Sequence, residues 1–262
     1  MVTDVVPSWL SCPVVGYGEW PIHETEVTVD NHTFVFSPLT SDRQASLHIE
    51  LVSSELEHKE AIKIINNILS LLCFCSNEAY WLGKSGGSGS TAKQLAFPRE
   101  QLKPFIRGID SFPNTLHLIS DVKTLRSLAH FRDARVAQLF SPTTACLAFY
   151  KVLERFKREE KEEYKDWIDQ QLDFLEDTYS YYINPLGKRA EMAKLSLQHF
   201  LFKAIRNSAV HALIDINFNR DDDDQLKMFD EALPVLEYLA QTYISDKLCV
   251  PDLLQAHQQR LF

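Results

Sequence analysis

The sequence has no apolar run long enough to cross a membrane. Its densest apolar run, from Ile68 to Cys75, is far shorter than the roughly 20 residues that a transmembrane helix needs, and Ser70 interrupts it. The first residues, Met-Val-Thr-Asp-Val-Val-Pro, have no basic residue ahead of an apolar stretch, so the pattern of a secretory signal is missing. We therefore expect a cytoplasmic protein that has no membrane partner.

Cysteine is scarce and scattered. The five cysteines are an odd number and lie far apart, which excludes the disulfide scaffold of a small secreted protein; they are Cys12, Cys73, Cys75, Cys146 and Cys249. Cys73 and Cys75 form a C-x-C, but no second Cys or His pair follows at the spacing of a zinc site. We expect this pair to be reduced and buried.

Glycine is concentrated in one segment. Residues 83–91 hold four of the eight glycines and include Gly-Lys-Ser, part of the phosphate-binding P-loop signature. The full signature would need glycine at position 78, where this chain has Glu78, and a P-loop follows a strand rather than the helix expected here. A flexible surface loop is the better interpretation. The aspartates at 221–224 lack the spacing and glycine turn of a calcium loop, so we expect no metal and no cofactor.

The rest of the composition is typical of a globular protein. Hydrophobic residues make up 45% and charged residues 24% of 262 residues, which fits one large domain or two small ones. The net charge is −9, so the surface as a whole repels phosphate backbones. Residues 140–262 are also acidic, with 15 basic and 21 acidic residues, a net charge of −6.

The first 118 residues form a mixed α/β pattern. Alternating apolar residues at 27–29 and 34–36 flank Asp-Asn-His, which predicts a β-hairpin, and a third strand is expected at 47–51. Apolar residues then recur at helical spacing from Glu55 to about Leu82, which predicts a helix over the sheet. We expect this domain to sense or bind something that its sequence does not identify.

Residues 119–262 are predicted to be helical, so the fold class is α+β with an antiparallel helical bundle after the α/β region. Ser141-Pro142 has the cap and first-turn proline of a helix start. The segment 184–187, Asn-Pro-Leu-Gly, is expected to break the next helix, and a long helix is predicted from about Lys188 to Ile214. A last helix, Gln225 to about Ile244, should be kinked by Pro234.

One motif on the predicted 188–214 helix stands out. Arg206-Asn207 is followed by His211, which resembles the Arg-Asn-x-x-x-His form of the R-x4–6-H signature of the HEPN superfamily. The resemblance covers roughly residues 120–245 and includes an earlier segment ending Phe-Tyr-Lys-Val-Leu-Glu at Glu154. This segment, with the mixed region before it, also resembles accessory protein J of bacterial methylamine-utilisation clusters and the ApeA-like HEPN branch.

The resemblance implies an endoribonuclease that works without metal and is toxin-like or associated with antiviral defence. Such enzymes attack the adjacent phosphate with the RNA 2′-hydroxyl at a site shared by two copies. His211 would act as general acid or base, Arg206 would stabilise the phosphate, and Asn207 would assist, which agrees with the chemistry of these residue types. The implied partners are RNA, a second copy, and an antitoxin or regulatory protein that restrains the toxin.

The sequence leaves a second interpretation open. Arg206 and His211 lie about 140° apart around an ideal helix and do not share a face, whereas Asn207 and His211 do. The helix would therefore have to be distorted or end near the motif, or a dimer would have to bring two motifs together. Alternatively, Arg206 pairs with a carboxylate such as Glu154, and the bundle is a non-catalytic binding or accessory module of the methylamine-utilisation type.

Overall fold

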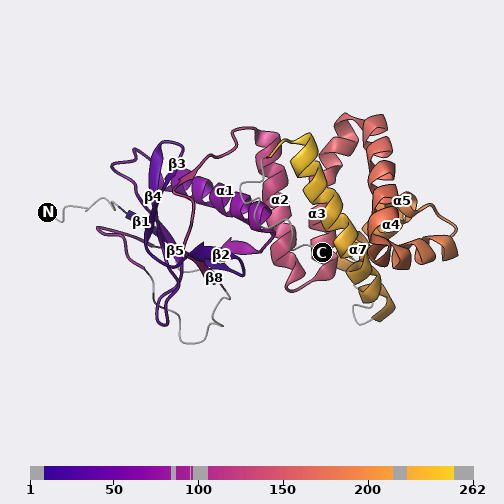
Figure 1. The fold of residues 1–262 in the computed structure, drawn as a ribbon, viewed down its shortest axis with the longest axis horizontal. Helices are drawn as coiled ribbons and strands as arrows, with labels where there is room; N and C mark the ends of the chain where they lie inside the picture. Colours follow the sequence, from indigo (N-terminus) through magenta and orange to yellow (C-terminus); the bar gives the residue numbers. More distant parts are fainter. Residues whose placement is uncertain (1–8, 84–86, 95, 97–105, 215–222, 251–262) are drawn as a thin grey trace. The chain divides into compact units, whose positions relative to one another are not determined.

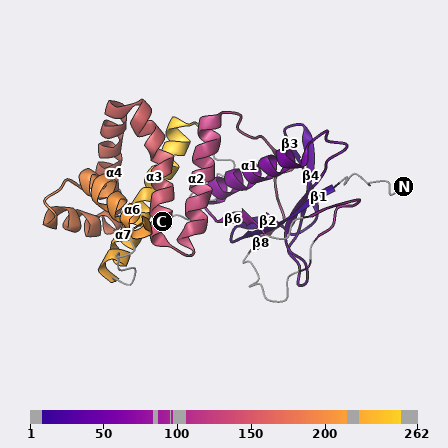
Figure 2. The same cartoon turned by 180° about the vertical axis from the view of Figure 1, so that it is seen from behind.

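The computed structural model describes residues 9–83, 87–94, 96, 106–214 and 223–250. These residues fall into two compact units, one that ends at Asp121 and one that begins at Val122. The first contains the β-sheets and the second is helical, so the fold is α+β (Figure 1, and from behind in Figure 2).

The first unit is built on a seven-stranded sheet in which β1 is flanked by β5 on one edge and by β6 and β7 on the other. The remaining order is β5-β4-β3-β9, with antiparallel pairing except between β3 and β9. The strands are β1 (Trp9–Gly16), β3 (Thr25–Val29), β4 (His32–Ser37), β5 (Ser46–Glu50), β6 (Tyr80–Leu82), β7 (Gly87–Gly89) and β9 (Thr115–Leu116). A separate parallel pair joins β2 (Glu19–Pro21) to β8 (Arg107–Ile109).

The predicted hairpin and third strand are confirmed. Val29 pairs with His32 across the turn, where Asp30 adopts a left-handed φ of 52°. Aspartate tolerates this conformation better than most residues. Phe34 and Phe36 on β4 are fully buried and supply much of the apolar face of the sheet.

The helix predicted from Glu55 to Leu82 is shorter than expected. α1 spans His58–Ser76 and ends at Asn77, which takes a left-handed conformation and donates its N–H to the Phe74 carbonyl. The residues after this cap are not helical, because Tyr80–Leu82 pairs with β1 as strand β6. The apolar residues beyond Asn77 therefore belong to the sheet.

The prediction for residues 83–91 is corrected in part. Gly87–Gly89 forms strand β7 and pairs with residues 9–11 of β1. Residues 84–86, which include the lysine and serine of Gly-Lys-Ser, lie outside the described residues. Backbone pairing needs no side chains, which explains how a glycine-rich segment can extend a sheet edge without an apolar pattern.

A buried histidine joins two strands of this sheet. His48 on β5 is 0% exposed, and its ring nitrogens lie 2.9 Å from the hydroxyl oxygens of Ser46 and Ser11. Burial lowers the pKa of His48 from 6.5 to about 4. The folded protein therefore holds a neutral imidazole that satisfies both hydroxyls.

The second unit is a bundle in which α3 is central. α2 spans Val122–Gln138 and α3 spans Pro142–Glu159, and α3 contacts α2, α4, α6 and α7. The predicted start of α3 is confirmed, because the Ser141 hydroxyl accepts the Thr144 N–H. Phe149, Phe156 and other apolar residues of α3 are buried, so this helix forms the centre of the core.

The break predicted at 184–187 is wrong. α4 spans Lys161–Met192 and consists of two helical segments joined at a kink at Tyr179, with φ −133° and ψ 44°. The interruption therefore precedes the predicted segment, and Pro185 lies within the helix that follows the kink. Ile183 and Leu186 on either side of the proline are buried. Their burial supports continuation of the helix, because tertiary packing can outweigh the loss of one backbone hydrogen bond.

The long helix predicted over Lys188–Ile214 is two segments. α4 ends at Met192, and a second helical segment starts after Ser196, whose hydroxyl accepts the His199 N–H. This segment comprises α5 (Leu197–His199), the π-helix η1 (Phe200–Ile205) and α6 (Arg206–Ile214). Serine is a residue type that often caps a helix N-terminus. Apolar residues on both sides of Ser196 repeat at helical spacing, so the sequence predicted one continuous helix instead.

The final predicted helix is confirmed, with shifted ends. α7 spans Asp223–Thr242, continues through Pro234 and is followed by the π-helix η2 (Tyr243–Lys247). Asp224 lies in the first turn of α7 and pairs with Arg189 of α4, which lowers the pKa of the Asp224 carboxyl. The first two aspartates of the 221–224 run lie outside the described residues.

In the described part of the chain, no helix is long and apolar enough to cross a membrane. All five cysteines carry free thiols, with Cys73 buried and Cys75 partly buried. No group of three or more His, Cys, Asp or Glu side chains among the described residues is arranged to hold a metal ion.

The His48 network predicts a specific acid sensitivity. Because the folded-state pKa of His48 is lowered, its stabilising contribution is complete above pH 6.5 and is lost as the pH falls towards 4. The loss should reach about 3 kcal/mol, the equivalent of the pKa difference. Urea unfolding of the wild type and of His48→Gln between pH 7 and about 4 tests this, since glutamine can bond both serines without titrating.

We expect His48→Gln to show the shallower loss of stability on acidification. His58→Gln, at an exposed histidine of the same unit, should keep the wild-type slope. Equal slopes in the wild type and His48→Gln would contradict the prediction.

Candidate functional site

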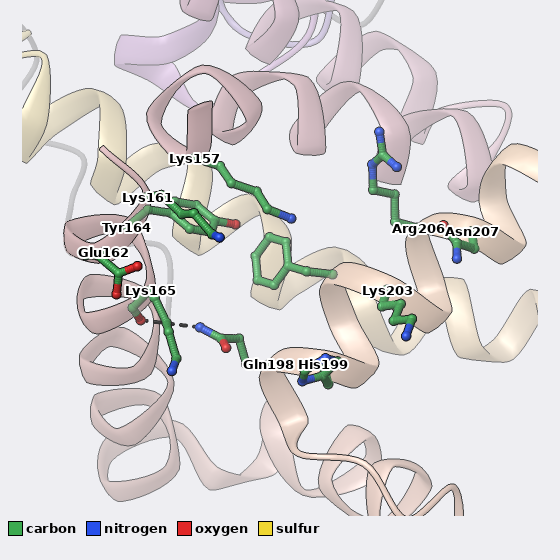
Figure 3. A pocket seen from close by; sticks show the side chains of 11 residues that line it. Lys157, Lys161, Glu162, Tyr164, Lys165, Gln198, His199, Lys203, Arg206 and Asn207 are labelled. Atoms are coloured by element: carbon green, nitrogen blue, oxygen red, sulfur yellow. Dashed lines mark hydrogen bonds between the residues drawn. The ribbon is translucent and has the colours of Figure 1, made fainter. Parts of the chain in front are cut away.

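The second unit contains an open hollow of about 460 Å³ between the α3–α4 junction and the helical segment from α5 to α6 (Figure 3). Arg206 and Asn207 of the predicted motif line it. A smaller hollow of about 330 Å³ adjoins it, shares Arg206 and reaches Tyr150 and Glu154 on α3. The first two motif residues therefore face a cavity, as the site hypothesis requires.

The backbone changes its hydrogen-bond pattern immediately before the motif. In η1 the backbone has a π-helical pattern, and the Arg206 N–H donates to the Leu201 carbonyl five residues earlier. The same carbonyl accepts a hydrogen bond from the Tyr150 hydroxyl at 2.5 Å. π-Helical turns are rare and are often found at functional sites. Here the wider turn gives the Leu201 carbonyl a partner from another helix.

Tyr150 is a buried hydrogen-bond donor at this junction. Its side chain is 2% exposed, and burial raises the pKa of its hydroxyl well above the usual value of 10. The hydroxyl therefore stays protonated and can donate to Leu201 throughout the physiological pH range. Tyr150 and Glu154 are four residues apart on α3, so both reach the motif helix from one face.

Glu154 holds the side chain of Arg206. A guanidinium nitrogen of Arg206 donates to Glu154 Oε1, and the two side chains are 40% and 31% exposed. Ion pairs with this exposure contribute only about 0.2–1 kcal/mol to stability. The pair therefore orients Arg206 more than it stabilises the fold. No other hydrogen bond from this guanidinium is formed within the described part of the chain, so donors remain for an anion.

The structure does not bring His211 to Arg206 within one chain. His211 is exposed and lies five residues along α6, outside both hollows, whereas Asn207 is exposed at the wall of the larger hollow. The helix is α-helical from Arg206 to Ile214, so the two side chains leave it about 140° apart. The helix is distorted before the motif, in η1, and is regular between Arg206 and His211.

The lysines of the hollow were not predicted as a site. Sequence analysis of the 151–163 region gives alternating acidic and basic residues, typical of a solvated face. In the structure Lys157 and Lys161 line the hollow together with Lys165 and Lys203. The spacing of four between Lys161 and Lys165 was one available signal, because it places both on one side of α4. Lys157 lies on α3, and the turn between the two helices brings it to the same hollow.

The Tyr150–Leu201 bond predicts a measurable loss of stability. Tyr150→Phe removes the hydroxyl and leaves the Leu201 carbonyl with the backbone bond alone, which should cost about 0.5–1.5 kcal/mol. Urea unfolding monitored by helical circular dichroism measures this. Tyr181→Phe, at a side chain that is 83% exposed, is the control and should change stability by less than about 0.5 kcal/mol. Equal effects would show that the buried bond contributes nothing.

The second unit resembles one known protein family. Residues 127–245, 119 of the 262 in the chain, match the family model described as methylamine utilization protein MauJ. No curated protein and no solved structure matches the chain. The matched range contains α3, the hollow and the Arg206–His211 motif, so the second unit is similar to the MauJ family.

Proposed function

We propose that the second unit is a HEPN-type endoribonuclease module that cleaves RNA by attack of the 2′-hydroxyl on the adjacent phosphate, without a metal. The observation that carries the proposal is the placement of Arg206. It lies partly exposed at the wall of a basic hollow, and Glu154 fixes its orientation. Residues 127–245, which are similar to the MauJ family, include this hollow and the motif.

The residue types suit this reaction. Arg206 offers a planar cation that stays charged and can bond two phosphoryl oxygens as negative charge develops. His211 is exposed, and an imidazole can serve as general acid or base towards the attacking or leaving oxygen. Asn207 lies one helical turn before His211 and can bond a phosphate oxygen or the imidazole.

The proposed active unit is a homodimer. Because Arg206 and His211 leave one helix in different directions, a scissile phosphate at Arg206 needs a histidine from elsewhere. A second copy packed against α6 would supply its own motif to the same phosphate. A protein of this kind would be toxin-like or defence-associated and would need a partner that restrains it.

A second candidate function is a non-catalytic binding or accessory module of the methylamine-utilisation type. Two observations favour it: Arg206 is already paired with a carboxylate, and His211 lies outside the hollow. In this case the motif would orient helices and the hollow would bind a ligand without cleaving it.

RNA cleavage in the presence of EDTA tests the first proposal. We expect the purified wild-type protein to produce 2′,3′-cyclic phosphate or 3′-phosphate ends, and His211→Ala to lose at least about 100-fold in rate, the usual contribution of a general acid or base. His117→Ala, at an exposed histidine of the first unit, should retain full activity.

Two results would contradict this assignment. Cleavage that persists in a folded His211→Ala protein would point to another site or a contaminating nuclease. No cleavage of diverse RNAs by a protein shown to be dimeric would favour the non-catalytic module.

The Glu154–Arg206 pair gives a separate prediction. Glu154→Gln should change the free energy of unfolding by less than about 1 kcal/mol, because the pair is partly exposed. It should lower the cleavage rate at saturating RNA by about tenfold, the equivalent of about 1.4 kcal/mol in the transition state, because Arg206 is no longer oriented. Glu154→Asp keeps the charge and should recover part of the rate.

A loss of stability with an unchanged cleavage rate would show that Glu154 is only structural. A change in KM without a change in kcat would show that it affects binding rather than the positioning of Arg206.

A further inference from the structure

The proposed cleavage motif leaves most of the positive charge of the hollow unexplained. Four lysines line it in addition to Arg206: Lys157 on α3, Lys161 and Lys165 on the first turns of α4, and Lys203 on η1 (Figure 3). Glu162 is the carboxylate at its wall. Five basic side chains around one cavity are unusual in a chain whose net charge is −9.

The neighbouring carboxylates do not neutralise these lysines. Glu154 pairs with Arg206, and Glu163 pairs with Lys247 at the other side of the α4 start. Across the described ranges, Lys157, Lys161, Lys165 and Lys203 form no ion pair. All four lysines are exposed, so solvent screens each charge, but together the charges add to a local positive potential at the hollow.

Two aromatic side chains also line the hollow. Tyr164 and Phe202 line it and meet edge to face, with their ring centroids 5.8 Å apart. Phe202 is partly exposed, so part of its ring is accessible to a ligand. Beside it the Gln198 amide donates to the Lys165 carbonyl at 3.3 Å and keeps a carbonyl oxygen and a second N–H for a polar ligand edge.

This combination of groups matches one class of ligand. Lysine ammonium groups bind phosphate as point charges, and aromatic rings stack on nucleobases. A single phosphodiester carries one negative charge, whereas the hollow offers four lysines without an ion-pair partner among the described residues. Its volume of about 460 Å³ lies within the usual range of small-ligand pockets.

We propose that the hollow binds a nucleotide that carries two or more adjacent phosphates at its 5′ position, with the phosphates on Lys157, Lys161 and Lys203 and the base against Phe202. Such a group occurs on a free nucleoside triphosphate and at the 5′ end of an unprocessed RNA. The hollow shares Arg206 and Asn207 with the cleavage motif. If the bound nucleotide is the 5′ end of an RNA substrate, the inference rests on the proposed ribonuclease function.

Binding measured apart from cleavage tests the inference. The probe is a fluorescent ten-nucleotide RNA with either a 5′-triphosphate or a 5′-hydroxyl end, and the protein is full-length His211→Ala, which keeps the hollow. In fluorescence anisotropy at about 0.15 M salt, where weak surface attraction is screened, we expect the triphosphate end to bind at least tenfold more tightly. Unlabelled ATP and inorganic triphosphate serve as competitors.

Matched variants assign the effect to the hollow. Replacing Lys157, Lys161 and Lys203 together by glutamine should abolish the preference for the triphosphate end. Replacing Lys63, Lys188 and Lys227 by glutamine changes the net charge equally, and these side chains are exposed and do not line the hollow. This control should keep the preference, and circular dichroism should show that both triple variants are folded.

Each outcome decides a different point. Competition by ATP at concentrations that displace the triphosphate RNA would identify the free nucleotide as a source, whereas ATP that fails to compete would identify the RNA end. Equal binding of the two RNA ends, or a preference that survives in the hollow variant, would overturn the inference. Absence of cleavage in the wild type would count against the proposed ribonuclease and would leave the binding result intact.

Discussion

The geometry of the candidate site depends on the attachment of α3 to the helix that carries the motif. Two side chains one turn apart on α3 make this attachment: the Tyr150 hydroxyl bonds the Leu201 carbonyl, and the Glu154 carboxylate bonds Arg206. The first contact is buried and fixes the backbone, and the second is partly exposed and orients a cation. Together they set where a guanidinium stands relative to the lysines from α3 and α4. The core around Phe149 and Phe156 holds α3 itself in place.

Local signals in the sequence predicted the elements that depend on nearby residues. The hairpin turn at Asp30 and the cap at Ser141 are set by short-range chemistry, and both are found as expected. The predictions failed where tertiary packing or strand pairing determines the secondary structure of a segment. The helix continues through Pro185 because its neighbours are buried, and Tyr80–Leu82 leaves the helical pattern because β1 offers a strand edge. Strand β1 itself could not be predicted, because its burial on consecutive residues removes the alternation that marks a strand.

The candidate site, too, was only partly predictable from the sequence. The motif and Glu154 were visible in the sequence, since their residue types and spacing are local features. The role of Tyr150 was not, because its partner carbonyl at Leu201 is fifty-one residues away in the chain. The π-helical turn was not either, because the apolar spacing of this segment predicted a regular helix. The lysines were not recognised because glutamates alternate with them in the sequence. In the structure Glu163 pairs with Lys247, and Glu162 is the one of these glutamates that lines the larger hollow. Net charge is therefore a poor guide to the potential of a single cavity in this protein.

The π-helical turn also constrains how the chain can vary in length. A π-turn accommodates one more residue than an α-helix over a similar rise. Deleting one residue between Phe200 and Ile205 would restore an ordinary α-helix, and Arg206 would keep nearly its present direction towards Glu154, because the π-turn absorbs the additional residue. Deleting a residue inside the regular helix α6 would instead rotate everything that follows by about 100°. A change of one residue in length is therefore tolerated in η1, whereas the same change between Arg206 and His211 would alter the direction in which His211 leaves the helix.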